Sequence, residues 1–297
     1  MSAKTYELVT LCPFLRKDQL RVCFKKCFNQ KILPKSSELS QKIDQYWNEK
    51  LKENPNIWNA TKFRYCSSYY DPKANVCTFN TGLSDYKSFI TTNISPYYPQ
   101  LEQLGLKENN DKFLYIGNPM GNQNLVLTKD GYAVYMRVSR THVQGGGRLA
   151  GPGGHPEPDN VQISEAPEEE NEELNQLIVN ELFNSSSREI FEEINIPISS
   201  LYVTRLLGFM SNLVTNGRQG ILFLAKTTLT KDEVYDAYMH GPVDKIESDY
   251  LEFIKFDDIT HDNIPPYHYV PEVLSIFEAL HLLYKQDPIL YDEIVNM

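Results

Sequence analysis

The chain carries apolar residues at every third or fourth position near residue 40, with polar residues between them. Serine residues suited to helix capping precede this run, and Pro55 follows it. The pattern predicts an amphipathic helix that ends before the proline. The apolar positions of this helix are Leu39, Ile43, Tyr46, Trp47 and Leu51.

Short runs rich in Tyr, Phe, Val and Ile fill much of the remaining chain, as is typical of β-strands. We predict strands at residues 62–71, 75–83, 113–117, 124–128, 131–139, 201–211, 219–229 and 250–256, and helices at 84–94, 174–194, 231–239 and 271–286. Asp130 and Gly131 predict a hairpin turn, Ser84 or Asp85 is expected to cap the helix at 84–94, and polar turns are expected over 97–111. This order of strands and helices indicates an α/β layered domain.

The character of the sequence changes near Phe113, where mixed helical and strand patterns give way to regular strand patterns. This change predicts a smaller α+β domain over residues 1–112 and a larger domain over residues 113–297. A Glu-rich segment near residues 160–175 is expected to be a solvated insertion loop.

Composition and charge restrict the class of protein. The 297 residues are 41% hydrophobic and carry a formal net charge of −10, which gives ample material for a core and argues against non-specific nucleic-acid binding. An anionic substrate then needs a local cation, such as a metal ion or clustered arginines. Because no segment resembles a signal peptide or a bilayer span, we expect a soluble intracellular protein, cytoplasmic or nuclear, with no nucleic-acid or membrane partner.

The cysteines are odd in number, lie in the first third of the chain and lack paired C-x-x-C spacing. We expect them to be reduced, mostly buried thiols, and we expect no zinc site. They are Cys12, Cys23, Cys27, Cys66 and Cys77.

Three glutamates in the segment SREIFEEINIP would share one face of a helix. Glu189, Glu192 and Glu193 are spaced three and four positions apart, so their carboxylates project together. Because like charges held this close repel one another, a cation between them is one interpretation. A solvated acidic helix face is the other, and the spacing alone leaves both open.

A glycine-rich loop, GPGGHPEPD at residues 151–159, precedes this helix. Together the two segments resemble the Nudix box, which is G, five residues, E, seven residues, then R-E-U-x-E-E-x-G-U with U a bulky aliphatic residue. Gly154 matches the leading glycine. The helical half matches at Arg188, Glu189, Ile190, Glu192, Glu193 and Ile196.

The chain departs from the box at several positions. Asn160 stands where the loop half expects glutamate, and Asn180 stands eight residues before Arg188, with Glu181 one place later. Extra residues that include the acidic segment separate the two halves. Asn195 replaces the usual glycine, although Asn also suits a left-handed helix cap.

Further segments resemble one Nudix subgroup, which hydrolyses UDP-glucose and UDP-galactose. They are PGGHPEP, YWNEKLKENPNIWNATKFR and GLSDYKSFITTN, and the resemblance runs from about Ile43 through the C-terminal part. It implies a Nudix α/β/α sandwich with a mixed sheet, preceded by a smaller α+β domain, with the box within residues 153–197. It also implies Mg²⁺-dependent cleavage of the substrate pyrophosphate to UMP and hexose 1-phosphate, with Mn²⁺ as an alternative metal.

The resemblance assigns roles to the helix. Glu189 and Glu193 are expected to ligate the metal, with Glu192 contributing directly or through water. Arg188 is expected to tie the helix to the preceding loop without touching substrate. The base that activates water stays open among Glu247, Glu181 and Glu192, because carboxylates near a metal titrate as a group.

Other residues are expected to bind substrate. Gly153 and Gly154 would let the backbone approach the diphosphate, and by resemblance His155 and Glu157 contact the nucleotide-sugar. Trp58 and Tyr86 match positions that line the substrate pocket, where an aromatic ring would stack on uracil, although a tryptophan in this context is also commonly a core residue. The candidates for phosphate binding are Arg137 and Arg140.

Three other functions remain as alternatives. The chain could hydrolyse another nucleoside diphosphate derivative such as ADP-ribose, which predicts a purine-sized pocket. It could be a catalytically silent nucleotide-sugar binding module, given the missing box glutamate. A purely structural acidic partner protein would leave the PGGHPEP loop without a role.

Overall fold

The computed structural model describes residues 4–138, 146–243, 248–259 and 268–295. Its strands are β1 (Tyr6–Leu15), β2 (Leu20–Phe24), β3 (Thr61–Asp71), β4 (Val76–Asp85), β5 (Gly121–Leu127), β6 (Tyr132–Val138), β7 (Leu149–Ala150), β8 (Leu201–Asn212), β9 (Arg218–Thr227) and β10 (Ser248–Lys255). Its helices are α1 (Glu38–Glu53), α2 (Tyr86–Ser88), α3 (Tyr98–Asn109), α4 (Glu172–Ile194), α5 (Lys231–Met239), α6 (Pro271–Gln286) and α7 (Pro288–Val295).

The larger sheet is mixed. Within the described ranges it has seven strands in the order β1-β8-β9-β5-β6-β10, and β7 pairs with β6. Strands β5 and β9 are parallel, with Gly121 opposite Gly220, and the other neighbouring pairs are antiparallel. Asp130 and Gly131 form the expected turn between β5 and β6, and Gly131 has a φ of 82°.

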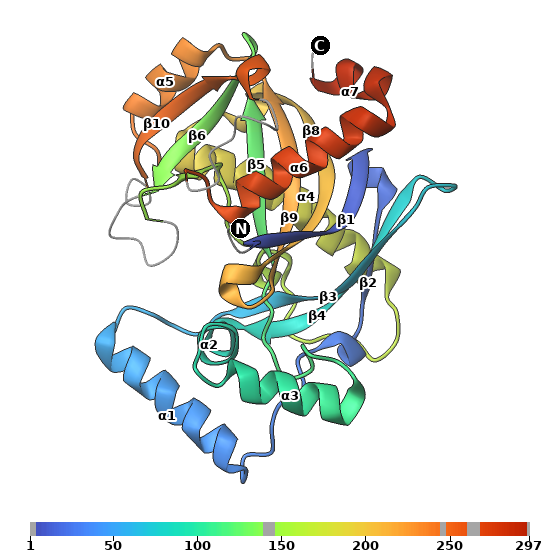
Figure 1. Cartoon of the computed structure of the whole chain (residues 1–297), viewed down its shortest axis with the longest axis vertical. Helices are drawn as coiled ribbons and strands as arrows, with labels where there is room; N and C mark the ends of the chain where they lie inside the picture. Colours follow the sequence, from blue (N-terminus) through green and yellow to red (C-terminus); the bar gives the residue numbers. More distant parts are fainter. Residues whose placement is uncertain (1–3, 139–145, 244–247, 260–267, 296–297) are drawn as a thin grey trace.

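Helices α4 and α6 cover opposite faces of this sheet (Figure 1). On one face, α6 packs Val273, Ile276 and Phe277 into a cluster with Leu222 and Leu224. On the other face, the apolar residues of α4 contact the sheet through two clusters. The α4 residues are Ile178, Leu182, Phe183, Ile190 and Ile194. The arrangement is the expected α/β/α sandwich.

The smaller sheet has the order β2-β4-β3 among the described residues and lies beside α1, α2 and α3 in Figure 1. Its inner face shares one core with the larger sheet, because Phe79 of β4 stacks on Phe209 of β8 with ring centroids 5.2 Å apart. Strand β1 pairs with β8, from Tyr6 opposite Asn212 to Leu15 opposite Leu206. The first strand therefore joins the larger sheet, while the division between residues 112 and 113 stays a prediction.

Local capping explains where several elements begin and end. Ser37 accepts a hydrogen bond from the Ser40 amide at the start of α1, and Asp85 accepts one from the Ser88 amide at the start of α2. The Asn171 side chain caps α4. Asn195 ends α4 with a φ of 57°, as expected for the residue that replaces glycine there.

Two expectations about local structure were wrong. Residues 97–111 contain helix α3, in which Leu101 and Gly105 are buried, so the polar residues of this segment lie on the outer face of a helix. Residues 113–117 form no strand; buried Arg64 donates hydrogen bonds to the carbonyl oxygens of Phe113 and Ile116. Side-chain donors thus satisfy a backbone that has no strand partner.

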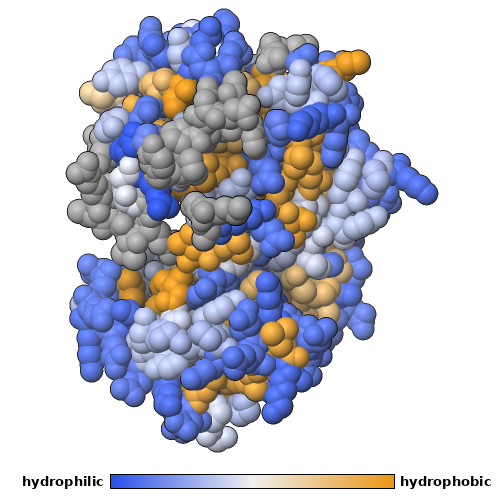
Figure 2. All heavy atoms as spheres, in the orientation of Figure 1, coloured by the Kyte–Doolittle hydropathy of each residue, from blue (hydrophilic) through white to orange (hydrophobic). Residues whose placement is uncertain are grey.

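The surface in the view of Figure 2 is mainly hydrophilic, with hydrophobic patches across its middle and smaller ones towards its upper and lower ends. No helix within the described ranges is long and apolar enough to cross a membrane. The cysteines are free, but Cys27 and Cys66 are exposed and Cys23 is half-buried, so the expectation that most are buried was wrong.

Candidate active site

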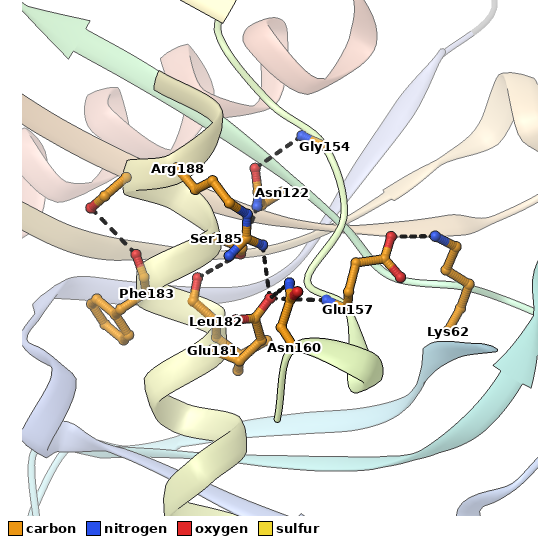
Figure 3. Close-up of polar contacts among 11 residues, drawn as sticks. Lys62, Asn122, Gly154, Glu157, Asn160, Glu181, Leu182, Phe183, Ser185 and Arg188 are labelled. Atoms are coloured by element: carbon orange, nitrogen blue, oxygen red, sulfur yellow. Dashed lines mark hydrogen bonds and ion pairs between the residues drawn. The ribbon is translucent and has the colours of Figure 1, made fainter. Parts of the chain in front are cut away.

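The glycine loop lies along strand β5. The Asn122 amide donates to the Gly154 carbonyl at 2.8 Å, and the Asn124 amide donates to the Pro152 carbonyl at 2.9 Å. The Asn122 side chain accepts from the Gly154 amide at 3.2 Å and donates to Ser185 of α4 at 2.9 Å, as Figure 3 shows. Asn122 therefore connects the loop, the sheet and the helix.

The two loop glycines lie against the carboxylates of α4. The Gly153 amide donates to Oε2 of Glu193 at 2.9 Å. A methyl group on Gly154 would lie 2.4 Å from the carboxyl carbon of Glu189, and one on Gly153 would lie 2.4 Å from the Asn122 carbonyl oxygen. The approach of a diphosphate to these glycines stays a prediction, and their close neighbours in the structure are the protein's own carboxylate and backbone.

Glu181 connects the loop to the helix. Its Oε1 accepts hydrogen bonds from the Glu157 amide at 3.0 Å, from the Asn160 side chain at 3.0 Å and from Arg188 at 2.8 Å (Figure 3). The side chain of Glu181 is 4% exposed and that of Arg188 is 29% exposed. Arg188 thus reaches the loop through Glu181, which agrees with its expected tying role.

Lys62 of β3 forms an ion pair with Glu157 of the loop (Figure 3). Burial raises the pKa of the Glu157 carboxyl, and the Lys62 ammonium opposes that rise. This contact joins the smaller sheet to the glycine loop. Glu157 is therefore held between the glycine loop and the smaller sheet, and its contact with the nucleotide-sugar stays a prediction.

His155 faces Arg218 of β9. Its Nε2 lies 3.3 Å from Nη2 of Arg218, and the Arg218 guanidinium lies over the Phe89 ring, 5.6 Å from the centroid. Burial, followed by the positive charges of Arg218 and Lys62, lowers the pKa of His155 well below its usual range. The imidazole is therefore neutral at neutral pH.

The two aromatic residues expected to line the pocket differ from each other in exposure. Trp58 is 75% exposed. Tyr86 is half-buried and contacts Trp47 and Phe89, with ring centroids 6.5 Å and 6.4 Å away. Tyr86 therefore adjoins Phe89, whose ring lies under the Arg218 guanidinium, whereas stacking of a base on the exposed Trp58 stays a prediction.

Arg137 is not a free cation. It forms an ion pair with Glu252 at 2.6 Å and donates to the Gly147 carbonyl at 3.0 Å. A phosphate at Arg137 would therefore compete with Glu252. Arg140 and Glu247, the other phosphate candidate and one candidate base, lie outside the described residues.

The residues around Gly153 and Gly154 fit a divalent metal ion. Among the described residues, no three His, Cys, Asp or Glu side chains are gathered as a closed metal site. Magnesium keeps several water ligands and is commonly held by one or two carboxylates together with substrate phosphates. Glu189 and Glu193 meet this requirement, because both carboxylates lie at the same loop and Glu192 stands on the adjacent turn of α4.

The acidic segment is held by Lys26 and by a contact with the start of α4. The Lys26 amide donates to the Pro167 carbonyl at 2.7 Å, and the Lys26 ammonium pairs with Glu168. Glu170 accepts from the Asn175 side chain at 3.2 Å. The glutamates at 168–170 are exposed, as a solvated insertion requires, although Ile163 and Ala166 are buried.

Sequence reasoning missed Lys62, Asn122 and Arg218. Lys62 and Arg218 lie far along the chain from the box, and nothing in their local pattern distinguishes them from surface cations. Asn122 did leave a signal, because GNQN places three consecutive amides at the start of an otherwise apolar strand in which every position is buried. Buried amides need hydrogen-bond partners, and here the partners are the loop and α4.

The chain is 30% identical over 257 residues to the human protein named uridine diphosphate glucose pyrophosphatase NUDT22, which covers 85% of this chain and 84% of that one. It is also 30% identical to the mouse protein of that name, over 84% of this chain and 80% of the relative. The protein named Nudix hydrolase 9 from Arabidopsis thaliana is 30% identical over 86% of this chain and 84% of its own length. No family profile matches the chain.

The chain therefore belongs to the Nudix hydrolases, a family of enzymes that generally require a divalent metal ion. Solved structures similar to it include a Nudix hydrolase from Nitrosomonas europaea, with 16% identity and a TM-score of 0.34 over 55% of this chain and 88% of that one. Another is the Nudix hydrolase RenU from M. Smegmatis, with 15% identity and a TM-score of 0.32 over 57% of this chain and 86% of that one. The family assignment rests on the sequence relatives.

Proposed function

We propose that this enzyme uses Mg²⁺ to hydrolyse the pyrophosphate of UDP-glucose and UDP-galactose, releasing UMP and hexose 1-phosphate. The names of the human and mouse relatives support this substrate class. The resemblance of the N-terminal segments to the same subgroup supports it independently of the box.

One observation carries the proposal. The carboxylates of Glu189 and Glu193, one helical turn apart, converge on Gly153 and Gly154. This places two hard oxygen donors beside a loop whose backbone has no side chain to exclude a substrate phosphate. A solvated acidic face would not require glycine at position 154, where a methyl group would meet the Glu189 carboxylate.

The reaction needs negative charge to be neutralised while water attacks phosphorus in line. A bound divalent metal ion supplies that neutralisation. The oxygen of water bonds to one phosphorus, the bridging P–O bond breaks, the bridging oxygen leaves with the other phosphorus, and a proton is released. The protein orients the diphosphate along the loop, which Asn122 and Glu181 hold in place.

Among the described candidates for the base, Glu192 fits better than Glu181. Glu181 is buried and accepts three hydrogen bonds from the loop and Arg188. Glu192 is half-exposed and lies next to Glu193 on the same helix. We therefore assign Glu181 to positioning the loop and propose Glu192 as the residue that accepts the proton from water.

The substrate panel tests the proposal. Purified enzyme is incubated with UDP-glucose, UDP-galactose and ADP-ribose, with and without Mg²⁺, and released mononucleotide is separated by chromatography. We expect Mg²⁺-dependent release of UMP from both UDP-hexoses at similar rates, since a pocket that does not bond the epimeric hydroxyl cannot separate them. Cleavage of ADP-ribose alone would contradict the proposal, and binding of UDP-glucose without turnover would show a silent module.

A further inference from the structure

Arg218 lies beside the glycine loop although it comes from a distant part of the chain. It begins β9 directly after a turn in which Asn216 and Gly217 have φ values of 52° and 86°. A methyl group on Gly121 would lie 2.4 Å from Nη2 of Arg218 and 3.2 Å from the carbonyl oxygen of Gly154. Glycine at position 121 therefore leaves room for the guanidinium next to the loop.

The charge of Arg218 has no counterion within the described part of the chain. Its contacts there are His155 and the face of Phe89, and no carboxylate forms an ion pair with it. Burial lowers the pKa of Arg218, and the more distant Glu272 opposes this only in part. Arg218 is half-buried, and a cation that loses part of its hydration is costly unless an anion approaches it. Lys62, the other cation near His155, is by contrast already paired with Glu157.

The state of His155 fits the approach of an anion. Arginine can only donate hydrogen bonds, so Nε2 of His155 accepts from Arg218 and the proton of the neutral ring lies on Nδ1. Accepting this bond fixes the guanidinium in one orientation and leaves its other N–H groups for a further partner. The fork geometry of those groups matches the oxygens of a phosphate.

We infer that Arg218 binds a phosphate group of the substrate diphosphate, with His155 holding its guanidinium in position. This rests on the proposed function and adds a specific anion contact outside the Nudix box. Gly154 then has the α4 carboxylate Glu189 against its Cα and the Arg218 cation near its carbonyl. The diphosphate would be held between a metal-binding helix and a fixed arginine.

Binding of UDP and uridine to the metal-free protein in EDTA, measured by calorimetry, tests this inference without turnover. The parent protein is expected to bind UDP more tightly than uridine. Arg218→Met is expected to weaken UDP binding by about tenfold or more, as loss of a charge-assisted hydrogen bond does, with no change for uridine. Arg218→Lys keeps the positive charge without the forked guanidinium, and its affinity for UDP should lie between those of the parent and of Arg218→Met.

Arg205→Met is the matched control. Arg205 is a half-buried arginine on the neighbouring strand β8 whose pKa is also lowered by burial, and it lies in a different hollow with Arg16 and Phe183. Its loss removes the same charge and should leave UDP binding within about twofold of the parent.

Two results would overturn the inference: Arg218→Met binding UDP as tightly as the parent, or Arg205→Met weakening it equally. The proposed function fails separately. If no UDP-sugar is cleaved yet UDP binding depends on Arg218, the inference stands and the activity is wrong. If UDP-glucose is cleaved while Arg218→Met keeps full UDP affinity, the activity stands and the inference is wrong.

Discussion

At the scale of single residues, the site depends on two glycines, which have no side chain. Gly153 and Gly154 differ in what a methyl group would meet: the backbone carbonyl of Asn122 in the first case and the end of the Glu189 side chain in the second. A backbone neighbour cannot move without disturbing β5, whereas a carboxylate can rotate away. A substitution at Gly153 therefore tests folding, and a substitution at Gly154 tests the position of the Glu189 carboxylate.

Gly153→Ala is expected to lower the free energy of unfolding by about 2–3 kcal/mol, since overpacking against a fixed neighbour has costs of this size. Gly154→Ala is expected to fold with a loss below about 1 kcal/mol but to lose most of its activity, because Glu189 must leave its place. Urea unfolding and the rate of UMP release measure the two effects. Equal stability losses in both variants would contradict this account.

His155 gives the stability a dependence on pH. Its pKa in the folded protein lies well below the usual value of 6.5, so between these two values the unfolded chain binds the extra proton. The free energy of unfolding should therefore rise as pH rises through this window, by at most about 1.4 kcal/mol per pH unit from this group, and level off above it.

His155→Gln should flatten that dependence, and comparing urea unfolding of parent and variant between pH 5 and 7 measures it. An exposed histidine, His240, provides the control variant His240→Gln, which should leave the slope unchanged. A parent protein whose stability does not change over this interval would show that His155 is not held neutral.

At the scale of elements, the insertion of the acidic segment did not remove the contact between the loop and α4. The single glutamate between the glycine and the arginine of the box would fall at Asn160 when counted from Gly154, and one place before Glu181 when counted from Arg188. The side chains of Asn160 and Glu181 meet at 3.0 Å. Glu181 lies seven residues before Arg188, which is two helical turns, so both side chains point to the same side of α4. One carboxylate thus holds the loop, the helix and the arginine together.

Glu181→Gln removes the charge that satisfies Arg188 and is expected to cost about 2–4 kcal/mol, because it breaks a largely buried ion pair. Glu169→Gln in the exposed acidic segment is the control and should change stability by less than about 0.5 kcal/mol. Thermal unfolding measures both. A loss below about 1 kcal/mol in Glu181→Gln would mean that the loop is held by its contacts with β5, Glu193 and Lys62 without Glu181.

The helices and strands also show which parts of the fold could be predicted from the sequence. The helices at 38–53, 172–194 and 271–286 could be predicted from their apolar periodicity, which capping serines supported in the first of them. Residues 97–111 and 113–117 could not, because one segment buries only a narrow apolar stripe and the other is held by Arg64 from a distant strand. Carboxylates inside the box were predictable from spacing, whereas Arg218 and Lys62 reach the loop through tertiary contacts that no local pattern encodes.

At the scale of the whole molecule, the two sheets share one core. Phe79 of β4 is fully buried and stacks on both Tyr65 and Phe209, with ring centroids 5.8 Å and 5.2 Å away. Strand β1 also binds the larger sheet although it precedes the smaller one in the chain. The two parts of the molecule are therefore expected to unfold together.

Both tryptophans, Trp47 and Trp58, lie in the smaller part, so their fluorescence reports on it, while far-UV circular dichroism reports on the whole chain. We expect the two unfolding curves to coincide. Phe79→Ala should shift both by the same amount, at a cost of about 3–5 kcal/mol. Two separate transitions, with only the fluorescence curve shifted in the variant, would show that the sheets fold independently.

The most direct test of the whole account is the rate of UMP release from UDP-glucose as Mg²⁺ is titrated, for the parent, Glu189→Gln and the exposed control Glu169→Gln. The account predicts that the rate of UMP release saturates with Mg²⁺ in the same way for the parent and for the control. Glu189→Gln should lose at least about 100-fold in kcat/KM, on the order of 3 kcal/mol of transition-state stabilisation. Turnover by Glu189→Gln at the rate of the parent, or turnover in the parent without a divalent metal, would contradict it.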